Sequence, residues 1–192
     1  MINQNTMSTT KKLVMYAVLT AVVVILQLLG AFIHFGMFSI TLVLVPIVIG
    51  AALCGPMAGA WLGFVFGLVV LISGDAAAFL AVNVPGTIIT VLAKGILAGY
   101  ITGLVYTLLK SFNSTVAIVV SAVVCPVINT GVFLIGCFLF FMDTITMWAG
   151  NSPSVANYII FVLVGGNFLF EIAANVILSP VIARILNIRK NM

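Results

Sequence analysis

Charged residues are scarce in this chain. Seven Lys or Arg and three Asp or Glu occur among 192 residues, so that 5% of the residues are charged and 64% are hydrophobic. A soluble domain carries about 25% charged residues, and ten charges cannot cover a water-facing surface of this size. The composition therefore excludes a soluble globular enzyme, a nucleic-acid-binding protein and a disordered tail. The mean hydropathy of +1.41 indicates an integral membrane protein.

The chain also lacks the residue clusters that carry enzymatic chemistry. Its one histidine, His34, lies at the end of an apolar run, and its three cysteines form no CxxC pair, so neither a metal site nor a redox pair is expected. No Ser/His/Asp arrangement, P-loop or dinucleotide-binding fingerprint is present. We therefore expect no catalytic residues, no metal and no cofactor bound by this chain. Active transport would take its energy from a partner or from an ion gradient.

Long apolar runs, broken by Gly, Pro, Asn and charged residues, predict transmembrane helices of about 20 residues each. The predicted spans cover residues 13–35, 38–53, 57–73, 87–109, 115–141 and 158–185. The second and third runs are short enough for tilted or partly re-entrant segments. The first run is too long for a cleaved signal peptide. The expected fold is an all-α bundle of six transmembrane helices, with residues 1–192 in a single domain.

Six spans bring both termini to the same side of the membrane, and the basic residues indicate which side. If the termini are cytoplasmic, six of the seven basic residues follow the positive-inside rule. These are Lys11, Lys12, Lys110, Arg184, Arg189 and Lys190. Asp75 and Asp143 then lie in connections on the outside.

Glycine recurs at every fourth position in two of the predicted spans. One ladder comprises Gly55, Gly59, Gly63 and Gly67, and the other comprises Gly95, Gly99 and Gly103. Small residues at this spacing let helix backbones approach closely in a membrane. We expect the ladders to pack helices within one chain. A seam between two copies is the alternative, and nothing in the sequence favours it.

Two charged residues, Lys94 and Glu171, lie well inside predicted spans. Ionisable side chains in the hydrocarbon are costly and usually face a cavity or one another. The two residues either form a buried ion pair between helices or point into an outward-facing pocket that holds a polar solute. Further polar or aromatic residues complete the candidate substrate site: Asn83, Tyr100, Asn129, Thr130, Trp148 and Asn167.

Several segments resemble the substrate-binding membrane subunits (S components) of energy-coupling factor (ECF) vitamin transporters. They are Leu53-Cys-Gly-Pro-Met-Ala-Gly-Ala-Trp-Leu-Gly63, Lys94-Gly-Ile-Leu-Ala-Gly-Tyr100, Asn129-Thr-Gly-Val132 and Asn167-x-x-x-Glu171 with Pro180 downstream. The resemblance covers nearly the whole chain. The pair Ala17 and Ala21 is similar to the AxxxA signature by which first helices of this family dock on the shared transmembrane partner.

The resemblance implies a multi-pass protein of a prokaryotic cytoplasmic membrane, with a substrate pocket open to the outside between the fourth to sixth helices. Such a chain captures a vitamin and then associates with a transmembrane scaffold subunit and two cytoplasmic ATPase subunits, which use ATP. The small faces of the first three helices would form the docking side.

The subgroup resembles pantothenate, pyridoxine and hydroxymethylpyrimidine carriers. A cation at Lys94 suits a carboxylate, so pantothenate is expected first, with Asn129, Thr130 and Asn167 satisfying its hydroxyl and amide groups. Where relatives often carry Pro-Arg, this chain has Ala93-Lys94, which keeps the charge but loses the bidentate geometry and bears on the substrate. If Glu171 faces the pocket unpaired, a pyridine or aminopyrimidine ring is favoured instead. Riboflavin comes last, because the sequence shows no dense aromatic sandwich.

A different class of function is a self-sufficient, oligomeric secondary transporter or channel, in which Lys94 and Glu171 form a proton or ion relay. The two halves of the chain show no clear internal repeat of the kind that marks inverted-repeat carriers. A third alternative is a membrane-embedded assembly factor that binds no solute.

Overall fold

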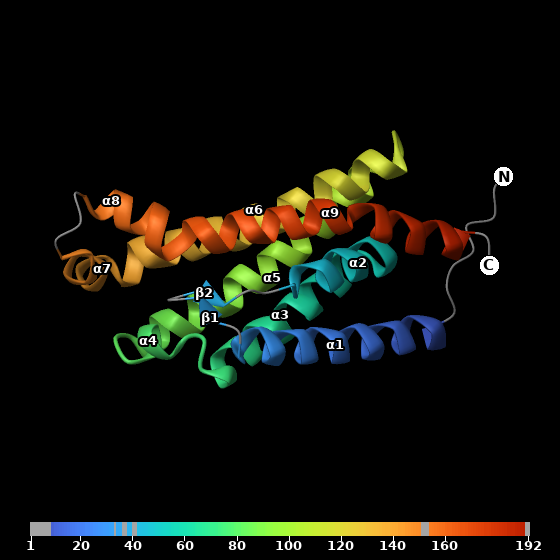
Figure 1. Cartoon of the computed structure of the whole chain (residues 1–192). Helices are drawn as coiled ribbons and strands as arrows, with labels where there is room; N and C mark the ends of the chain where they lie inside the picture. The colour runs from blue at the N-terminus through green and yellow to red at the C-terminus, as the bar shows by residue number, and fades with distance from the viewer. Residues whose placement is uncertain (1–8, 33, 36–37, 40–41, 151–153, 191–192) are drawn as a thin grey trace.

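The computed structural model describes residues 9–32, 34–35, 38–39, 42–150 and 154–190, and nearly all of them are helical (Figure 1). The long helices are α1 (Thr9–Phe32), α3 (Pro56–Ser73), α5 (Val84–Leu109), α6 (Ser114–Phe140) and α9 (Gly165–Lys190). The short ones are α2 (Leu44–Cys54), α4 (Ala77–Leu80), α7 (Met142–Ala149), α8 (Val155–Asn157) and the π-helix η1 (Tyr158–Val164). A two-residue antiparallel pairing joins β1 (His34–Phe35) to β2 (Phe38–Ser39).

Glycine, proline and asparagine set the ends of the helices that build the bundle. Gly55 lies between α2 and α3 with a φ of 95°, and Pro56 begins α3. Gly74, with a φ of 93°, ends α3 in the left-handed conformation that glycine adopts without steric cost. Side-chain oxygens of Asn83 and Asn113 accept hydrogen bonds from backbone N–H groups in the first turns of α5 and α6. The helices therefore begin and end at breaks that are visible in the sequence.

Among the described residues, five helices are long and apolar enough to cross a membrane, and α2 is a shorter apolar helix. The predicted second span over residues 38–53 is too long, because residues 38–39 form β2 and the helix begins only at Leu44. At 1.5 Å per residue, α2 extends about 16 Å, roughly half of the hydrocarbon core. The all-helical architecture is confirmed, whereas six full spans remain a prediction.

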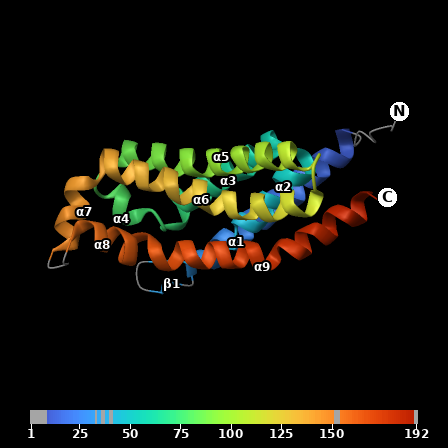
Figure 2. The ribbon, with the colours of Figure 1, turned by 90° about the horizontal axis from the view of Figure 1, so that it is seen from above.

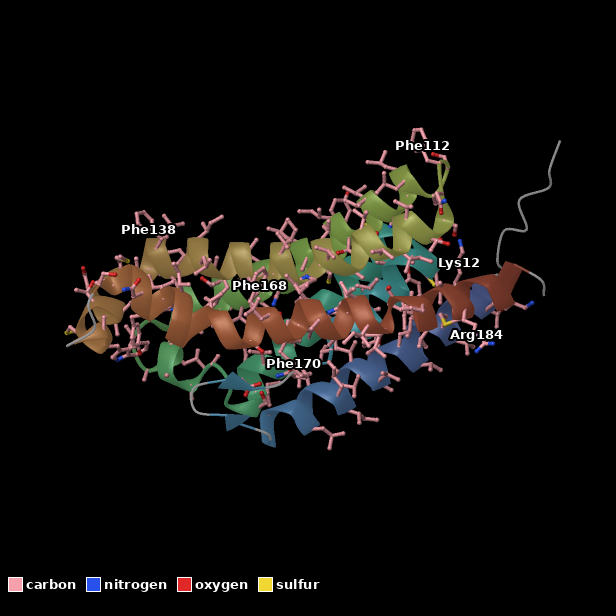
Figure 3. All side chains as sticks on the ribbon, turned by 45° about the horizontal axis from the view of Figure 1, so that its top comes forward. Lys12, Phe112, Phe138, Phe168, Phe170 and Arg184 are labelled. Carbon is pink, nitrogen blue, oxygen red and sulfur yellow. The ribbon has the colours of Figure 1, made fainter. Side chains whose placement is uncertain are left out.

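The helices form an elongated bundle in which α1 begins and α9 ends at the same end (Figure 1). The helices α4, α7 and α8 lie at the opposite end (Figure 2). The side chains of Lys12 and Arg184 lie at the end where the chain begins and finishes (Figure 3). The acidic residues Asp75 and Asp143 belong to the other end, beside α4 and in α7. This separation of charge matches the predicted positive-inside arrangement, and the sidedness in a membrane remains a prediction.

The most extensive helix contact joins α3 to α5. Gly59 and Gly63 of α3 lie against Gly99 and Gly95 of α5, and a Cβ on any of the four would overlap the backbone of the facing glycine. Helix backbones approach this closely only where side chains are missing. The prediction that the glycine ladders pack helices within the chain is confirmed.

Two clusters of buried apolar side chains lie in the bundle. The larger one joins the helices α1, α2, α3, α5, α6 and α9, and includes Val23, Ile47 and Leu62. The smaller one forms around Phe141 and Ile145, where α6 meets α7. The candidate site adjoins the smaller cluster, because Phe141 belongs to that cluster and also lines the cavity described below.

Candidate functional site

A cavity of about 290 Å³ lies in the half of the bundle that is remote from the described ends of the chain. Its wall comes from α1, α3, the segment between α3 and α5, α5, α6, α7, η1 and α9. Three charged residues line it, together with polar and aromatic side chains. The polar and charged lining residues are Gln27, Asp75, Thr87, Thr90, Lys94, Asn129, Thr130, Asn167 and Glu171.

Most of the predicted substrate-site residues line this cavity. Lys94 is on α5, Asn129 and Thr130 are on α6, Trp148 is on α7, and Asn167 and Glu171 are on α9. The fold therefore brings residues of four helices to one cavity. Their contact with a substrate remains a prediction.

Asn83 and Tyr100 were also expected in the site, but neither is among the residues that line the cavity. The side chain of Asn83 caps α5 by accepting a hydrogen bond from the N–H of Gly86 at 2.9 Å. Tyr100 is 37% exposed and lies six residues after Lys94, further toward the end of α5. The position of Asn83 is thus explained by helix capping rather than by the cavity.

Lys94 lies among aromatic rings. Its Nζ atom is 5.2 Å from the ring centroid of Phe133 and 5.6 Å from that of Phe66. Such cation–π contacts stabilise a cation that is partly removed from water. The carboxylates of Glu171 and Asp75 also attract the ammonium group. The sequence left open whether Lys94 and Glu171 pair or face a solute, and the structure shows both lining the same cavity.

Glu171 is almost completely buried, with 2% of its surface exposed. Its Oε1 atom accepts a hydrogen bond from Nδ2 of Asn167 at 3.1 Å, as expected for residues one turn apart on a helix face. One turn further along, Nδ2 of Asn175 donates to the backbone oxygen of Glu171 at 2.8 Å. Asn167 therefore orients the carboxylate, whereas Asn175 binds the backbone of the same helix.

Four polar residues of the cavity were missed by sequence reasoning: Gln27, Asp75, Thr87 and Thr90. Gln27 of α1 is fully buried, and its Nε2 atom donates a hydrogen bond to Oδ2 of Asp75. The lone amide in an apolar helix was a signal for Gln27, because a buried amide needs a hydrogen-bond partner. Asp75 follows Gly74 in what looked like an outside connection, and its proximity to α1 depends on tertiary packing.

The aromatic wall of the cavity was missed as well, except for Trp148. It consists of Phe66, Phe79, Phe133, Phe141, Trp148 and Phe168. The ring of Phe79 in α4 meets those of Phe133, Phe141 and Trp148 edge-on, with centroids 5.5, 5.0 and 5.5 Å apart. No dense aromatic cluster is visible in the sequence, because these rings come from five different helices and from the residue between α6 and α7.

The predicted docking residues lie away from the cavity. Ala17 and Ala21 are exposed on α1, one turn apart and therefore on one helix face. The hydroxyl of Thr20 accepts a hydrogen bond from Nε1 of Trp61 in α3 at 3.1 Å, which fixes α1 against α3. The exposure of the two alanines leaves that face available for a partner, and docking itself remains a prediction.

The arrangement is suited to holding a small polar solute. Among the described residues, no three His, Cys, Asp or Glu side chains gather as they would around a metal ion. The lining instead combines one cation, two carboxylates, uncharged hydrogen-bonding groups and aromatic rings. Small-ligand sites in proteins have this composition, a largely apolar wall with a few placed polar groups.

Comparison with models of protein families gives a match over most of the chain. A family model described as "ECF transporter, substrate-specific component" matches residues 11–185. A comparison with curated proteins found no match. The matched range contains all the residues that line the cavity, from Gln27 to Glu171.

Proposed function

Because the chain belongs to the family of substrate-specific components of ECF transporters, we propose that it captures a small water-soluble vitamin for an ABC-type importer. Family membership makes the chain a transporter subunit rather than an enzyme, and its long apolar helices make it a multi-pass membrane protein. We further propose that the substrate is a vitamin, that the chain binds it with high affinity, and that partner subunits drive its delivery. The membrane in this proposal is the cytoplasmic membrane of a prokaryote.

The observation that carries this proposal is the cavity. Charged and polar groups gather there in an otherwise apolar bundle, and their burial is costly unless a function or a partner compensates it. Its position opposite to the basic end supports access from the outside, given the positive-inside rule. A capture subunit needs a site of this kind and needs no catalytic group.

The partners proposed for the chain are a transmembrane scaffold subunit and two cytoplasmic ATPase subunits. Exposed Ala17 and Ala21 on α1 support docking on the scaffold, because small residues let a second helix approach closely. ATP hydrolysis in the partner ATPases would drive release of the vitamin on the inside.

The candidate vitamins are pantothenate, then pyridoxine or hydroxymethylpyrimidine, then riboflavin. The sequence favours pantothenate, because a cation at Lys94 suits a carboxylate. Glu171 and Asp75 line the same cavity. Glu171 is paired with Asn167, so the case of an unpaired Glu171 does not apply. Two carboxylates against one lysine in the lining instead support a pyridine or aminopyrimidine ring over an anion.

The test is to purify the full chain without partners and to measure its binding of a panel of B vitamins by titration calorimetry. We expect one vitamin to bind with a Kd of about 1 µM or lower. If none binds, and the protein in liposomes without partners moves a solute or protons, the self-sufficient transporter with a relay of Lys94 and Glu171 is correct instead. The absence of both binding and flux would favour the assembly factor.

A further inference from the structure

Two amide–carboxylate pairs line the cavity and share one arrangement. Nε2 of Gln27 donates to Oδ2 of Asp75, and Nδ2 of Asn167 donates to Oε1 of Glu171 at 3.1 Å. An ionised carboxylate only accepts hydrogen bonds. It therefore fixes each amide with the NH₂ group toward the carboxylate and the carbonyl oxygen turned away from it.

The carbonyl oxygens of both amides are buried and accept no hydrogen bond from any described residue. The same is true of Oδ1 of Asn129, whose side chain is 4% exposed. A buried acceptor without a donor costs free energy, which a solute with matching donors recovers on binding. The lining residues of the cavity thus offer more acceptors than their own donors satisfy.

The net charge of the lining residues also disfavours an anionic solute. Lys94 is the single cation, and Asp75 and Glu171 are two carboxylates, so the formal charge of the lining is −1 when both acids are ionised. Lys94 is already attracted by both carboxylates and by the rings of Phe66 and Phe133. A solute with a carboxylate would meet two like charges, which is unfavourable.

The aromatic wall and the volume limit the shape of the solute. The faces of aromatic rings carry partial negative charge, so they attract cations and ring edges that bear N–H groups. A cavity of about 290 Å³ is at the lower end of the range for ligand sites, which is about 300–1,000 Å³. The wall therefore suits one planar ring with short substituents.

We propose that the cavity selects a single-ring nitrogen heterocycle that is neutral or singly positive and bears several N–H or O–H donors. It discriminates against solutes with a carboxylate. Asp75 and Glu171 are then specificity-determining residues, held in place by Gln27 and Asn167, and Lys94 balances the acids instead of binding an anion. This inference rests on the proposed capture function and reverses the sequence-based preference for pantothenate.

The experiment compares matched solutes on the full chain in lipid nanodiscs by titration calorimetry. Pyridoxine is paired with pyridoxic acid, which has the same ring with a carboxylate in place of one hydroxymethyl group. Hydroxymethylpyrimidine is paired with its analogue without the exocyclic amino group. Pantothenate and the other B vitamins complete the panel. In the pair that binds, we expect the carboxylate, or the missing amino group, to weaken binding by about tenfold or more.

Variants of the acids provide a second measurement. Asp75→Asn and Glu171→Gln should each weaken binding of the preferred ring by about tenfold and reduce the discrimination against its matched analogue. Asp143→Asn is the matched control, because Asp143 is the third acid of the chain, is exposed, and does not line the cavity. Monodispersity and melting temperature show whether each variant folds, and the matched solutes test the inference without any variant.

The outcomes separate the inference from the function on which it rests. If no vitamin binds, the capture function is wrong. If the tightest-binding solute carries a carboxylate or more than one ring, the capture function stands and this inference is wrong. The inference is also overturned if folded Glu171→Gln and Asp75→Asn variants discriminate against the matched analogue as strongly as the Asp143→Asn control does.

Discussion

The backbones of Gly63 in α3 and Gly95 in α5 are in direct contact, since a Cβ on either glycine would overlap the carbonyl oxygen of the other. This contact lies beside the cavity. Lys94 precedes Gly95, and Phe66, whose ring is 5.6 Å from Nζ of Lys94, lies one turn after Gly63. The approach of the two glycines therefore sets the distance between the cation of the site and one of its aromatic walls.

Replacing Gly63 by alanine should destabilise the protein. The new Cβ overlaps backbone atoms of Gly95, so α3 and α5 must separate, at a cost of about 1–3 kcal/mol. The measurement is the melting temperature of the purified protein in detergent. Gly131→Ala on α6 is the matched control, because a Cβ at Gly131 meets nothing within 4 Å. Equal melting temperatures for the two variants would contradict the close packing of α3 on α5.

Lys94 and Glu171 should be energetically coupled in the empty protein. Each single substitution, Lys94→Met or Glu171→Gln, leaves one charge of the cavity without its attraction to the other. The double variant should therefore lose less stability than the sum of the single variants, by about 1 kcal/mol. The free energy of unfolding in mixed micelles is measured for the unsubstituted protein, the two single variants and the double variant. Additive losses would show that the two residues act separately.

Phe79 should shield Trp148 from water. Its ring packs edge-on against Trp148 at a centroid distance of 5.5 Å, and it belongs to α4, in the connection between α3 and α5. In a Trp61→Phe background Trp148 is the single tryptophan, since the chain has two. Phe79→Ala should then increase the quenching of Trp148 fluorescence by acrylamide.

The control for this measurement is Phe112→Ala in the same background. Phe112 is 88% exposed and lies between α5 and α6, at the other end of the bundle. Its loss should leave the quenching of Trp148 unchanged. A Phe79→Ala variant that is quenched no more than this control would disprove the shielding.

A bulky residue at the proposed docking face should separate capture from uptake. Ala17→Trp or Ala21→Trp should abolish vitamin uptake by cells, because a large side chain keeps a partner helix away. Vitamin binding by the purified variants should stay unchanged, since neither alanine lines the cavity. Ile177→Trp on α9 is the control, because Ile177 is 72% exposed and lies on a different helix. Loss of binding in the alanine variants would contradict the division between docking and capture.

Much of the candidate site could be predicted because buried polar residues stand out in apolar helices. Lys94, Asn129, Asn167 and Glu171 were selected for this reason, and all four line one cavity. Asn83 was selected by the same argument, but its position at a helix start gives it a local hydrogen-bonding role. A polar residue near a helix end is therefore weaker support for a site than one in the middle of a helix.

The other residues of the cavity gave weaker signals. Phenylalanine is common in membrane helices, so Phe66, Phe133 and Phe168 could not be distinguished from residues that face lipid. Asp75 was expected in a connection in water, and only the packing of α1 beside the end of α3 brings it to Gln27. These positions depend on contacts between segments far apart in the chain.

By itself, the sequence determined that this is a membrane protein. It also determined at which residues most of the helices begin and end, and which faces of α3 and α5 meet. These properties follow from composition, from capping residues and from the four-residue spacing of glycine, all of which act within one segment. Only the tertiary structure decided that α2 is short, that two carboxylates and one lysine share a cavity, and that aromatic rings from five helices surround it. The physical reason is that side chains from several helices meet at one cavity only if the helices cross and rotate against one another in a particular way. The residue pattern of a single helix does not contain that information.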